Sequence, residues 1–317
     1  MADRLRGDRL ATPDATSGPD YRQNVPMTDW QAISTRNARC VQTTIGWIFW
    51  DPGAVARYEA VGLPEGLAGP LGYIASRSAP LAHVGPAAVT AAFGSISPLG
   101  ISAAFELLDA RGFARMWAER DAAVADGLAL YAPHIIAPLI EFGPELWEVV
   151  SALPLAGRVF FGAHLDMDRP TDPLLSGWHA VNCLREWRGD THWALVVAAG
   201  LTHAEASILH NAWVDYESDW LARSRGTAPE VIDAGWEALA SKGLAQGRTV
   251  TAAGLDLRRH IEDETDRLGS LPWQLLGEAR SEEFADRFEP PCELLLARVD
   301  VTAGPNYQPA SRIRIEP

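Results

Sequence analysis

Basic residues are scarce in this sequence. Lys and Arg together number 27, against 41 Asp and Glu, which gives a formal net charge of −14. Proteins that bind nucleic-acid backbones need cations to neutralise the phosphates, and polybasic segments are what anionic membranes attract. The charge balance therefore argues against DNA as a partner and against a membrane partner.

Cysteines and cofactor motifs are sparse or missing as well. Cys40, Cys183 and Cys292 lie far apart and form no CxxC pair, so neither a disulfide framework nor a cysteine-rich zinc site is supported. The sequence contains no HExxH or HxxxH pair and no glycine-rich phosphate loop. We predict no metal and no cofactor.

Long apolar runs are absent too. No stretch approaches the roughly 18 apolar residues of a membrane span, and residues 1–27 lack the apolar region of a secretory signal. These polar residues offer little to bury, and we expect them to form a disordered leader. The sequence predicts a soluble, cytoplasmic protein.

Tryptophan, in contrast, is plentiful, with 12 copies in a chain that is 47% hydrophobic. Trp47, Phe49 and Trp50 cluster near the N-terminus, and further tryptophans surround a polar motif in the second half, at positions Trp178, Trp187 and Trp193. Two interpretations are open. The rings could pack a helical core, or they could form the wall of a cavity for a hydrophobic small molecule.

Apolar residues recur at helical spacing along most of the chain, and Pro and Gly clusters separate the segments. We therefore predict a mostly α fold. The expected divisions are a leader over 1–27, a helical N-terminal domain over 28–169, a winged-helix-like domain over 170–290 and a C-terminal tail over 291–317.

The second half has the element order of a winged helix. Thr202 and Glu205 have the spacing of a capping box at the start of one of its helices. The expected elements are, in order, a helix over 177–187, a break at 188–190, helices over 191–199, 203–213 and 232–241, a small two-stranded wing around 246–248, and a long helix over 251–268.

Several motifs resemble those of a known family. They read Tyr73-Ile74-Ala75-Ser76-Arg77, Trp178-His179-Ala180, Leu184-Arg185-Glu186-Trp187-Arg188-Gly189-Asp190-Thr191-His192, Ala199-Gly200-Leu201 and Lys242-Gly243-Leu244. On these residues the chain resembles the actinobacterial helix-turn-helix group related to SalK, which is distantly similar to MarR-type winged helices.

The resemblance covers about residues 43–277. It implies a helical N-terminal half packed on a MarR-like winged-helix half, and a link to natural-product gene clusters, where some members lie. The chain departs from the family over 45–50, which reads Ile-Gly-Trp-Ile-Phe-Trp where members often carry a His-Ala pair followed by Tyr-Phe. This departure puts any shared site that uses that histidine in doubt.

The winged-helix resemblance raises the question of DNA binding. The segment 203–213, taken as the recognition helix, contains no Arg or Lys, and the expected wing holds only Arg248. Base readout and phosphate contacts both rely on such cations. Arg223 and Arg225 could form a local basic patch, although a solvated loop explains them equally well. A homodimer would double the charge without changing its sign.

The strongest chemical candidate is a group of polar residues around the motif at 185–192. Arg185 and Arg188 lie three apart, so both could converge on one anion. His192 could act as an acid or base near neutral pH, oriented by Asp190 or Glu205. The alternative, which we favour, is a buried Arg–carboxylate network that joins helices.

We predict from these observations a winged-helix-derived protein that binds a hydrophobic, aromatic or polyketide-like molecule between its halves. The leading hypothesis is a cofactor-independent cyclase, isomerase or dehydratase of secondary metabolism; the alternatives are a ligand-responsive MarR-like regulator and a non-catalytic metabolite-binding or resistance protein. The predicted catalytic residues are Arg185, Arg188, Asp190 and His192. The predicted ligand contacts are Trp47, Phe49, Trp50, Arg77, Trp178, His179, Trp187, Trp193 and Glu205.

Overall fold

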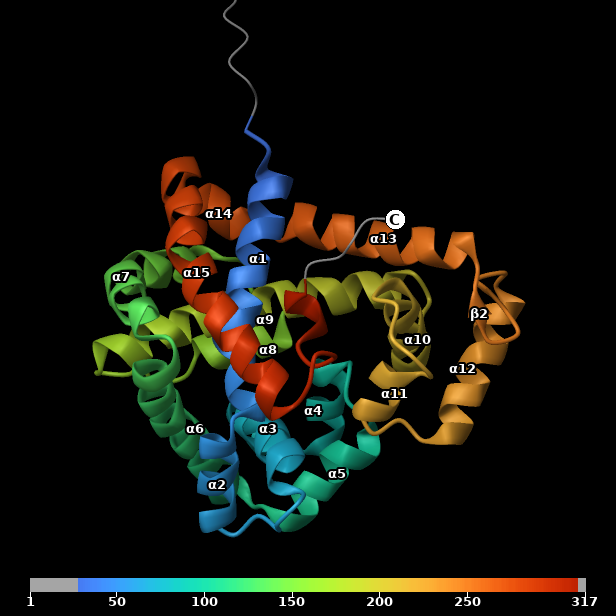
Figure 1. Cartoon of the computed structure of the whole chain (residues 1–317), viewed down its shortest axis with the longest axis horizontal. Helices are drawn as coiled ribbons and strands as arrows, with labels where there is room; N and C mark the ends of the chain where they lie inside the picture. Colours follow the sequence, from blue (N-terminus) through green and yellow to red (C-terminus); the bar gives the residue numbers. More distant parts are fainter. Residues whose placement is uncertain (1–27, 313–317) are drawn as a thin grey trace, which may run out of the picture.

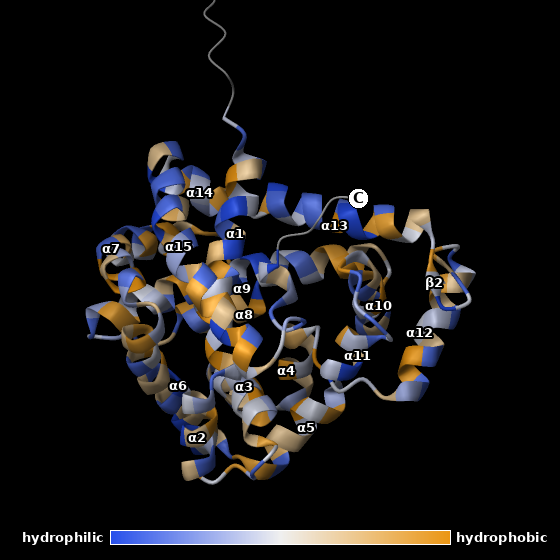
Figure 2. Cartoon of the chain, in the orientation of Figure 1, coloured by the Kyte–Doolittle hydropathy of each residue, from blue (hydrophilic) through white to orange (hydrophobic). Residues whose placement is uncertain are grey.

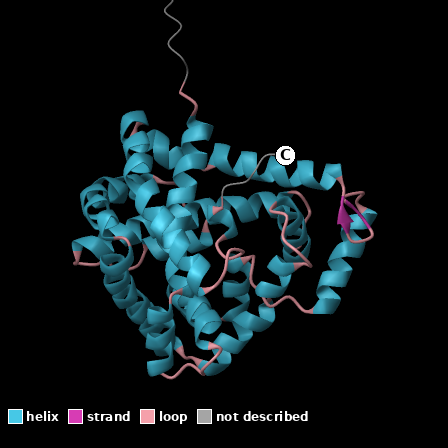
Figure 3. Cartoon of the chain, viewed as in Figure 1, coloured by secondary structure: helices cyan, strands magenta, loops and turns pink. Residues whose placement is uncertain are grey.

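Helices make up almost all of the secondary structure. The computed structural model describes residues 28–312, so the predicted leader over 1–27 lies outside the described residues. Figure 1 and Figure 3 show helices packed in several directions around a central helix, with one small pair of strands at an edge. The predicted mostly α fold is confirmed.

The N-terminal elements are short to medium helices separated by Pro- and Gly-containing turns. Their bounds are α1 (Trp30–Gly46), α2 (Pro52–Ala60), α3 (Ala68–Ser78), α4 (Pro86–Phe93), α5 (Pro98–Leu107), α6 (Ala110–Tyr131), α7 (Ile136–Ala152) and α8 (Val159–Leu165), with 3-10 turns η1 (Trp47–Trp50), η2 (Ala79–Val84) and η3 (Pro133–Ile135).

The remaining elements include the two longest helices. They are α9 (Pro173–Ala198), α10 (His203–Trp213), α11 (Trp220–Ser224), α12 (Pro229–Ser241), β1 (Ala245–Gln246), β2 (Thr249–Val250), α13 (Ala252–Leu268), α14 (Leu271–Leu276), α15 (Glu278–Thr302) and the 3-10 turn η4 (Pro309–Ser311).

Two separate hydrophobic cores organise the molecule. The larger core joins α1 to α8 with the first part of α9 and with α14 and α15. The smaller core joins the end of α9 with α10, α11, α12, β1 and α13. Figure 2 shows hydrophobic residues gathered in the middle of the larger body, whereas α13 is largely hydrophilic. Of the helices in residues 28–312, α9 alone contributes buried residues to both cores, so it connects the two halves.

α9 is one continuous helix, and the predicted break at 188–190 is wrong. The helix begins at Pro173 with Asp172 as its N-cap, whose carboxylate accepts from the Leu175 amide at 2.9 Å. Gly189 sits inside it, at a cost of about 1 kcal/mol relative to alanine. The neighbouring side chains are held by other helices, because Arg188 pairs with α13 and Asp190 accepts from the Phe161 amide. These tertiary contacts outweigh the local preference of the sequence for a turn.

The local expectations for the following segment are confirmed. Thr202 and Glu205 form the capping box of α10, since the Thr202 hydroxyl accepts from the Glu205 amide and the Glu205 carboxylate accepts from the Thr202 amide. β1 and β2 pair antiparallel, with Ala245 opposite Val250. This hairpin sits between α12 and α13, where the element order of the sequence placed a wing.

The predicted C-terminal tail over 291–317 is helical up to Thr302. α15 continues through Pro290 and Pro291, and its residues Cys292, Leu295 and Val299 are buried at helical spacing. The helix lies alongside α1 (Figure 1), so that segments from the two ends of the chain are packed together. The apolar stripe that follows the two prolines packs against α1.

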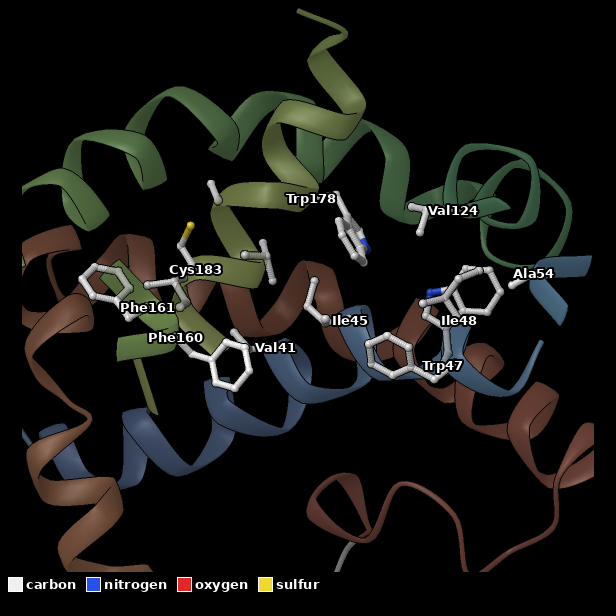
Figure 4. Close-up of a cluster of buried hydrophobic side chains, with 14 of the residues drawn as sticks. Val41, Ile45, Trp47, Ile48, Ala54, Val124, Phe160, Phe161, Trp178 and Cys183 are labelled. Atoms are coloured by element: carbon white, nitrogen blue, oxygen red, sulfur yellow. The ribbon is translucent and has the colours of Figure 1, made fainter. Parts of the chain in front are cut away.

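Three of the predicted ligand-contacting tryptophans belong to the larger core. Trp47, Trp178 and Trp187 are each at most 1% exposed, and Figure 4 shows Trp47 and Trp178 among buried aliphatic and aromatic side chains. Trp178 donates its indole N–H to the Thr44 carbonyl at 2.9 Å. For these rings, core packing replaces the predicted role as a cavity wall.

Within residues 28–312 no single helix is long and apolar enough to cross a membrane. One pair bent by 112° at its joint, Ala110–Tyr131 with Pro133–Ala152, meets the length and composition limits only when the two are taken together.

The close approach of α7 and α9 gives a test of the fold. A methyl group on Gly177 would lie 2.0 Å from the carbonyl oxygen of Leu139, which is backbone and cannot move aside. We expect Gly177→Ala to lower the free energy of unfolding by about 2 kcal/mol or more, measured by urea denaturation. Gly162→Ala is the control, because its methyl would meet only Leu155 at 3.8 Å; its stability should be unchanged or up to about 1 kcal/mol higher. Equal stability of the two variants would contradict the packing described here.

Candidate ligand-binding site

A pocket of about 470 Å³ lies where the two cores meet. One side of it comes from the larger core, through Phe49, Trp50, Tyr73 and Arg77, and the other from the smaller core, through α10, α11 and α13. α9 contributes Arg185, Arg188, Gly189, His192, Trp193 and Val196 along one side, and the segment Tyr307–Ala310 before the C-terminus contributes a further part.

Seven of the predicted site residues line this pocket. They are Phe49, Trp50, Arg77, Arg185, Arg188, His192 and Trp193. They come from η1 and α3 in the first part of the chain and from α9, so that Arg77 and Arg185, for example, meet although they are more than a hundred positions apart in the sequence. Trp193 keeps its place because its ring rests on the backbone of Gly94, where a methyl group would come within 2.3 Å of the indole.

Six predicted residues lie elsewhere. Besides the three core tryptophans, His179 donates from Nε2 to the His164 carbonyl at 3.0 Å inside the larger core. Asp190 accepts from the Phe161 amide at 2.9 Å, and burial raises its pKa to about 6. Glu205 belongs to the capping box and pairs with Lys242 at 2.6 Å. Four of these residues belong to α9, and they project from other faces of the helix than the residues that line the pocket. They are Trp178, His179, Trp187 and Asp190.

The floor of the pocket is built on one fully buried carboxylate. Glu186 is 0% exposed. Its carboxylate accepts two hydrogen bonds from Arg77, at 3.0 and 2.7 Å, and one from Arg185 at 2.7 Å. Burial alone would raise the pKa of Glu186, but the two guanidinium groups outweigh it and hold the pKa well below its usual range. The predicted Arg–carboxylate network between helices is therefore present, with Glu186 at its centre.

A second network closes the pocket on the α13 side. Arg188 reaches Glu262 at 2.5 Å and Asp266 at 2.7 Å, and Arg258 reaches Glu262 at 2.8 Å. The two acidic residues hold the pKa of Arg188 above its usual value despite burial. These pairs fasten α13 to α9 across the pocket.

His192 lines the pocket in its neutral form. Burial, followed by the charge of Arg258, lowers the pKa of His192 to about 3. Its Nδ1 lies 3.2 Å from the Thr265 hydroxyl, which itself donates to the Ile261 carbonyl at 2.6 Å. Thr265 has only one hydroxyl proton, so Nδ1 must be the protonated nitrogen and donate to Thr265. Nε2 is left as a hydrogen-bond acceptor.

Several pocket residues were not among the predicted ones. Tyr73 accepts from Arg77 at 3.2 Å, and although burial alone would raise its pKa, Arg77 and Arg185 lower it. Arg225, which the sequence left open between a basic patch and a solvated loop, lines the pocket and donates to Ser207 at 3.0 Å. Only the tyrosine carried a sequence signal, since it opens the motif that ends at Arg77.

An aromatic cluster covers another side of the pocket. Tyr307 packs against Trp50 with ring centroids 4.3 Å apart and against Trp220 at 4.8 Å. The segment that carries it is held by Arg39, which donates to the Ser311 carbonyl at 2.9 Å. Trp50 belongs to the larger core and Trp220 to α11, so Tyr307 bridges the two sides.

Comparison with known proteins is consistent with the element order of the second half. The model of a helix-turn-helix family matches residues 34–302, which is most of the chain. The chain belongs to this helix-turn-helix family. No curated protein and no solved structure matches it. The narrower likeness to SalK-related and MarR-type proteins stays a prediction.

The buried histidines of this helix-turn-helix protein should make its stability depend on pH. Burial lowers the pKa of His164 to about 4 and those of His179 and His192 to about 3, whereas an unfolded histidine titrates near ~6.5. At these three rings the unfolded chain therefore binds more protons below pH 6.5, and acid favours it. Asp190, whose pKa is raised to about 6, acts in the opposite direction by about 1 kcal/mol, which is less than the combined effect of the three histidines.

We expect the free energy of unfolding, measured by urea denaturation, to fall between pH 7 and pH 5 by up to about 2 kcal/mol for each of the three histidines. His192→Gln should reduce this loss by about one histidine's share. His83→Gln, which changes an exposed residue, should leave it as in the wild type. A stability that does not change over this pH range would contradict neutral burial of the three rings.

Proposed function

We propose that this helix-turn-helix protein binds a small molecule in the pocket between its two cores. The observation that carries the proposal is the pocket itself, whose volume of about 470 Å³ lies within the range of small-molecule sites. Its wall combines aromatic rings with convergent polar groups, which is the usual composition of such sites. A bound molecule would contact both halves of the protein at once.

Binding is better supported than the acid–base catalysis predicted for His192. A general acid or base works best with a pKa near the operating pH, and the pKa of His192 is lowered to about 3. Asp190, its predicted partner, bonds to the Phe161 amide on another side of α9. The pocket offers His192 as a neutral acceptor for a ligand hydroxyl or N–H, and the enzyme of secondary metabolism stays a prediction.

A ligand-responsive transcription regulator is the second candidate, and the family match favours it. In a winged helix, the helix directly before the wing is the one that would enter the major groove, and here that helix is α12 rather than the segment 203–213. α10 has no exposed residue, because α11, α12 and α13 pack against it.

The charge on α12 argues against DNA as the main partner. Its exposed residues include Glu230, Asp233 and Glu237, and the helix contains no Arg or Lys. Carboxylates facing the groove would repel phosphates instead of neutralising them. The wing cation Arg248 is already paired with Asp219 at 2.9 Å and with Asp233.

Pocket binding can be tested with N-phenyl-1-naphthylamine, an uncharged aromatic dye that fluoresces in apolar surroundings. We expect saturable binding to the wild type. Ala206→Trp should abolish it, because Ala206 lines the pocket and an indole there would fill it. Ala234→Trp places the same ring on the exposed face of α12 and should leave the dye affinity unchanged. Absence of saturable binding to the wild type, or equal binding to both variants, would overturn the proposal.

A gel-shift titration separates the two candidates. We expect no sequence-selective shift of DNA from around the gene at 150 mM salt with competitor DNA, because phosphate contacts without free cations are weak at that ionic strength. A sequence-selective complex of the wild type that survives these conditions would make the regulator the correct function.

A further inference from the structure

The pocket has the opposite charge to the rest of the protein. Among residues 28–312, six arginines line it, whereas Glu262 is the only carboxylate in its wall. The chain as a whole carries 27 cationic and 41 anionic residues. More than a fifth of the cations thus converge on one small cavity, and the position of this charge calls for an explanation.

Four of the six arginines are paired with carboxylates of the protein. Arg77 and Arg185 share the buried Glu186. Arg188 and Arg258 share Glu262, and Arg188 also reaches Asp266. These pairs shape the pocket, and their three carboxylates offset all but one of the four positive charges. Within residues 28–312 the two lining arginines that form no ion pair with a carboxylate are Arg223, which is exposed at the rim, and Arg225.

Arg225 is held in place without a carboxylate. Its Nη1 donates to the Ser207 hydroxyl at 3.0 Å, and its backbone carbonyl accepts from the Ser97 amide at 3.0 Å. Within residues 28–312 no carboxylate lies within ion-pair distance of its guanidinium group. A guanidinium has five N–H donors, so most of its donors are left for another partner.

The surroundings of Arg225 increase its attraction for an anion. Burial, together with the smaller effect of the Arg258 charge, lowers the pKa of Arg225 to about 10. The group therefore remains charged at neutral pH, although burial and the neighbouring positive charge both disfavour its charged form. A negative charge beside it would stabilise the charged form. Planar anions also match the guanidinium fork, which can hold both of their oxygens at once.

The aromatic rings define the rest of the ligand. Trp50, Trp193, Trp220 and Tyr307 all line the same pocket. Flat apolar surface can stack on such rings or pack against their edges. A molecule that satisfies both features has one anionic group and an aromatic body.

We propose that the pocket takes an aromatic organic acid, whose anionic group binds Arg225. This inference rests on the proposed function, since it names the ligand class of the same pocket. Arg225 is its specificity-determining residue, and the four paired arginines maintain the shape of the pocket around it. Aromatic carboxylates and aromatic phosphate monoesters both carry an anionic group that Arg225 could bind, and the experiment distinguishes them.

Competition against N-phenyl-1-naphthylamine tests the inference on the unmodified protein. 2-Naphthoate, 2-naphthyl phosphate and the uncharged 2-naphthamide carry the same ring system. We expect at least one of the two anions to displace the dye at a concentration about tenfold or more below that of the amide, because hydrogen bonds between charged groups are about twice as strong as neutral ones. The anion that displaces the dye at the lower concentration shows whether the anionic group of the ligand is a carboxylate or a phosphate.

The Arg225 variants assign the effect to one residue. Arg225→Gln should bring the anion and the amide to within about threefold of each other while dye binding persists, and Arg225→Lys should retain part of the preference. Arg259→Gln removes a charge from an exposed residue of α13 that pairs only with Asp256, and it should keep the full preference.

The outcomes separate this inference from the proposed function. If the dye binds but the wild type does not prefer either anion over the amide, the acid is the wrong ligand class and the pocket proposal stands. A preference that survives Arg225→Gln overturns the assignment to Arg225. If the dye does not bind to the wild type, the proposed function itself fails.

Discussion

The buried ion pair between Glu186 and two arginines is the interaction on which the pocket depends. Glu186 has no contact with solvent, and it holds Arg77 from α3 and Arg185 from its own helix. A buried charge is tolerated only when it is paired and hydrogen-bonded. The position of α3 against α9 is thereby fixed, and with it the side of the pocket that carries Tyr73.

α9 extends this constraint into the second half of the molecule. Its first part packs in the larger core, its end packs in the smaller one, and Arg188 between them reaches α13. Tyr307, which packs against both Trp50 and Trp220, adds a further link between the halves. A ligand in the pocket would add contacts across the same junction, which is a physical reason for a small molecule to affect both halves.

The location of charge is also informative about the family. A helix-turn-helix unit is normally associated with cations on its exposed helix, but here α12 presents carboxylates and the arginines face inwards. Function belongs to sites rather than to folds. The same architecture can therefore carry carboxylates on its outer surface while arginines line a pocket inside it.

Part of the site followed from the sequence, and the missing part has a definite cause. Arg185, Arg188 and His192 lie within one motif and share a helix, so their proximity was predictable from spacing. Trp178 and Trp187 lie on the same helix, yet they point into the core. This could not be predicted, because residue spacing does not show which face of a helix borders a cavity when the helix packs on several sides. Arg225 stood out in the sequence only as part of a possible basic patch with Arg223, and nothing local placed it at the pocket, since its partners Ser207 and Ser97 come from other segments.

The sequence by itself determined the helical content, the capping box of α10, the hairpin after α12 and the acidic character of the chain. These features depend on residues within a few positions of each other, or on composition alone. Only the tertiary structure decided that α9 continues through Gly189, that α15 continues through its two prolines, and that six arginines meet in one pocket. Each of these depends on contacts between residues far apart in the sequence, whose energies exceed the local preferences of the chain.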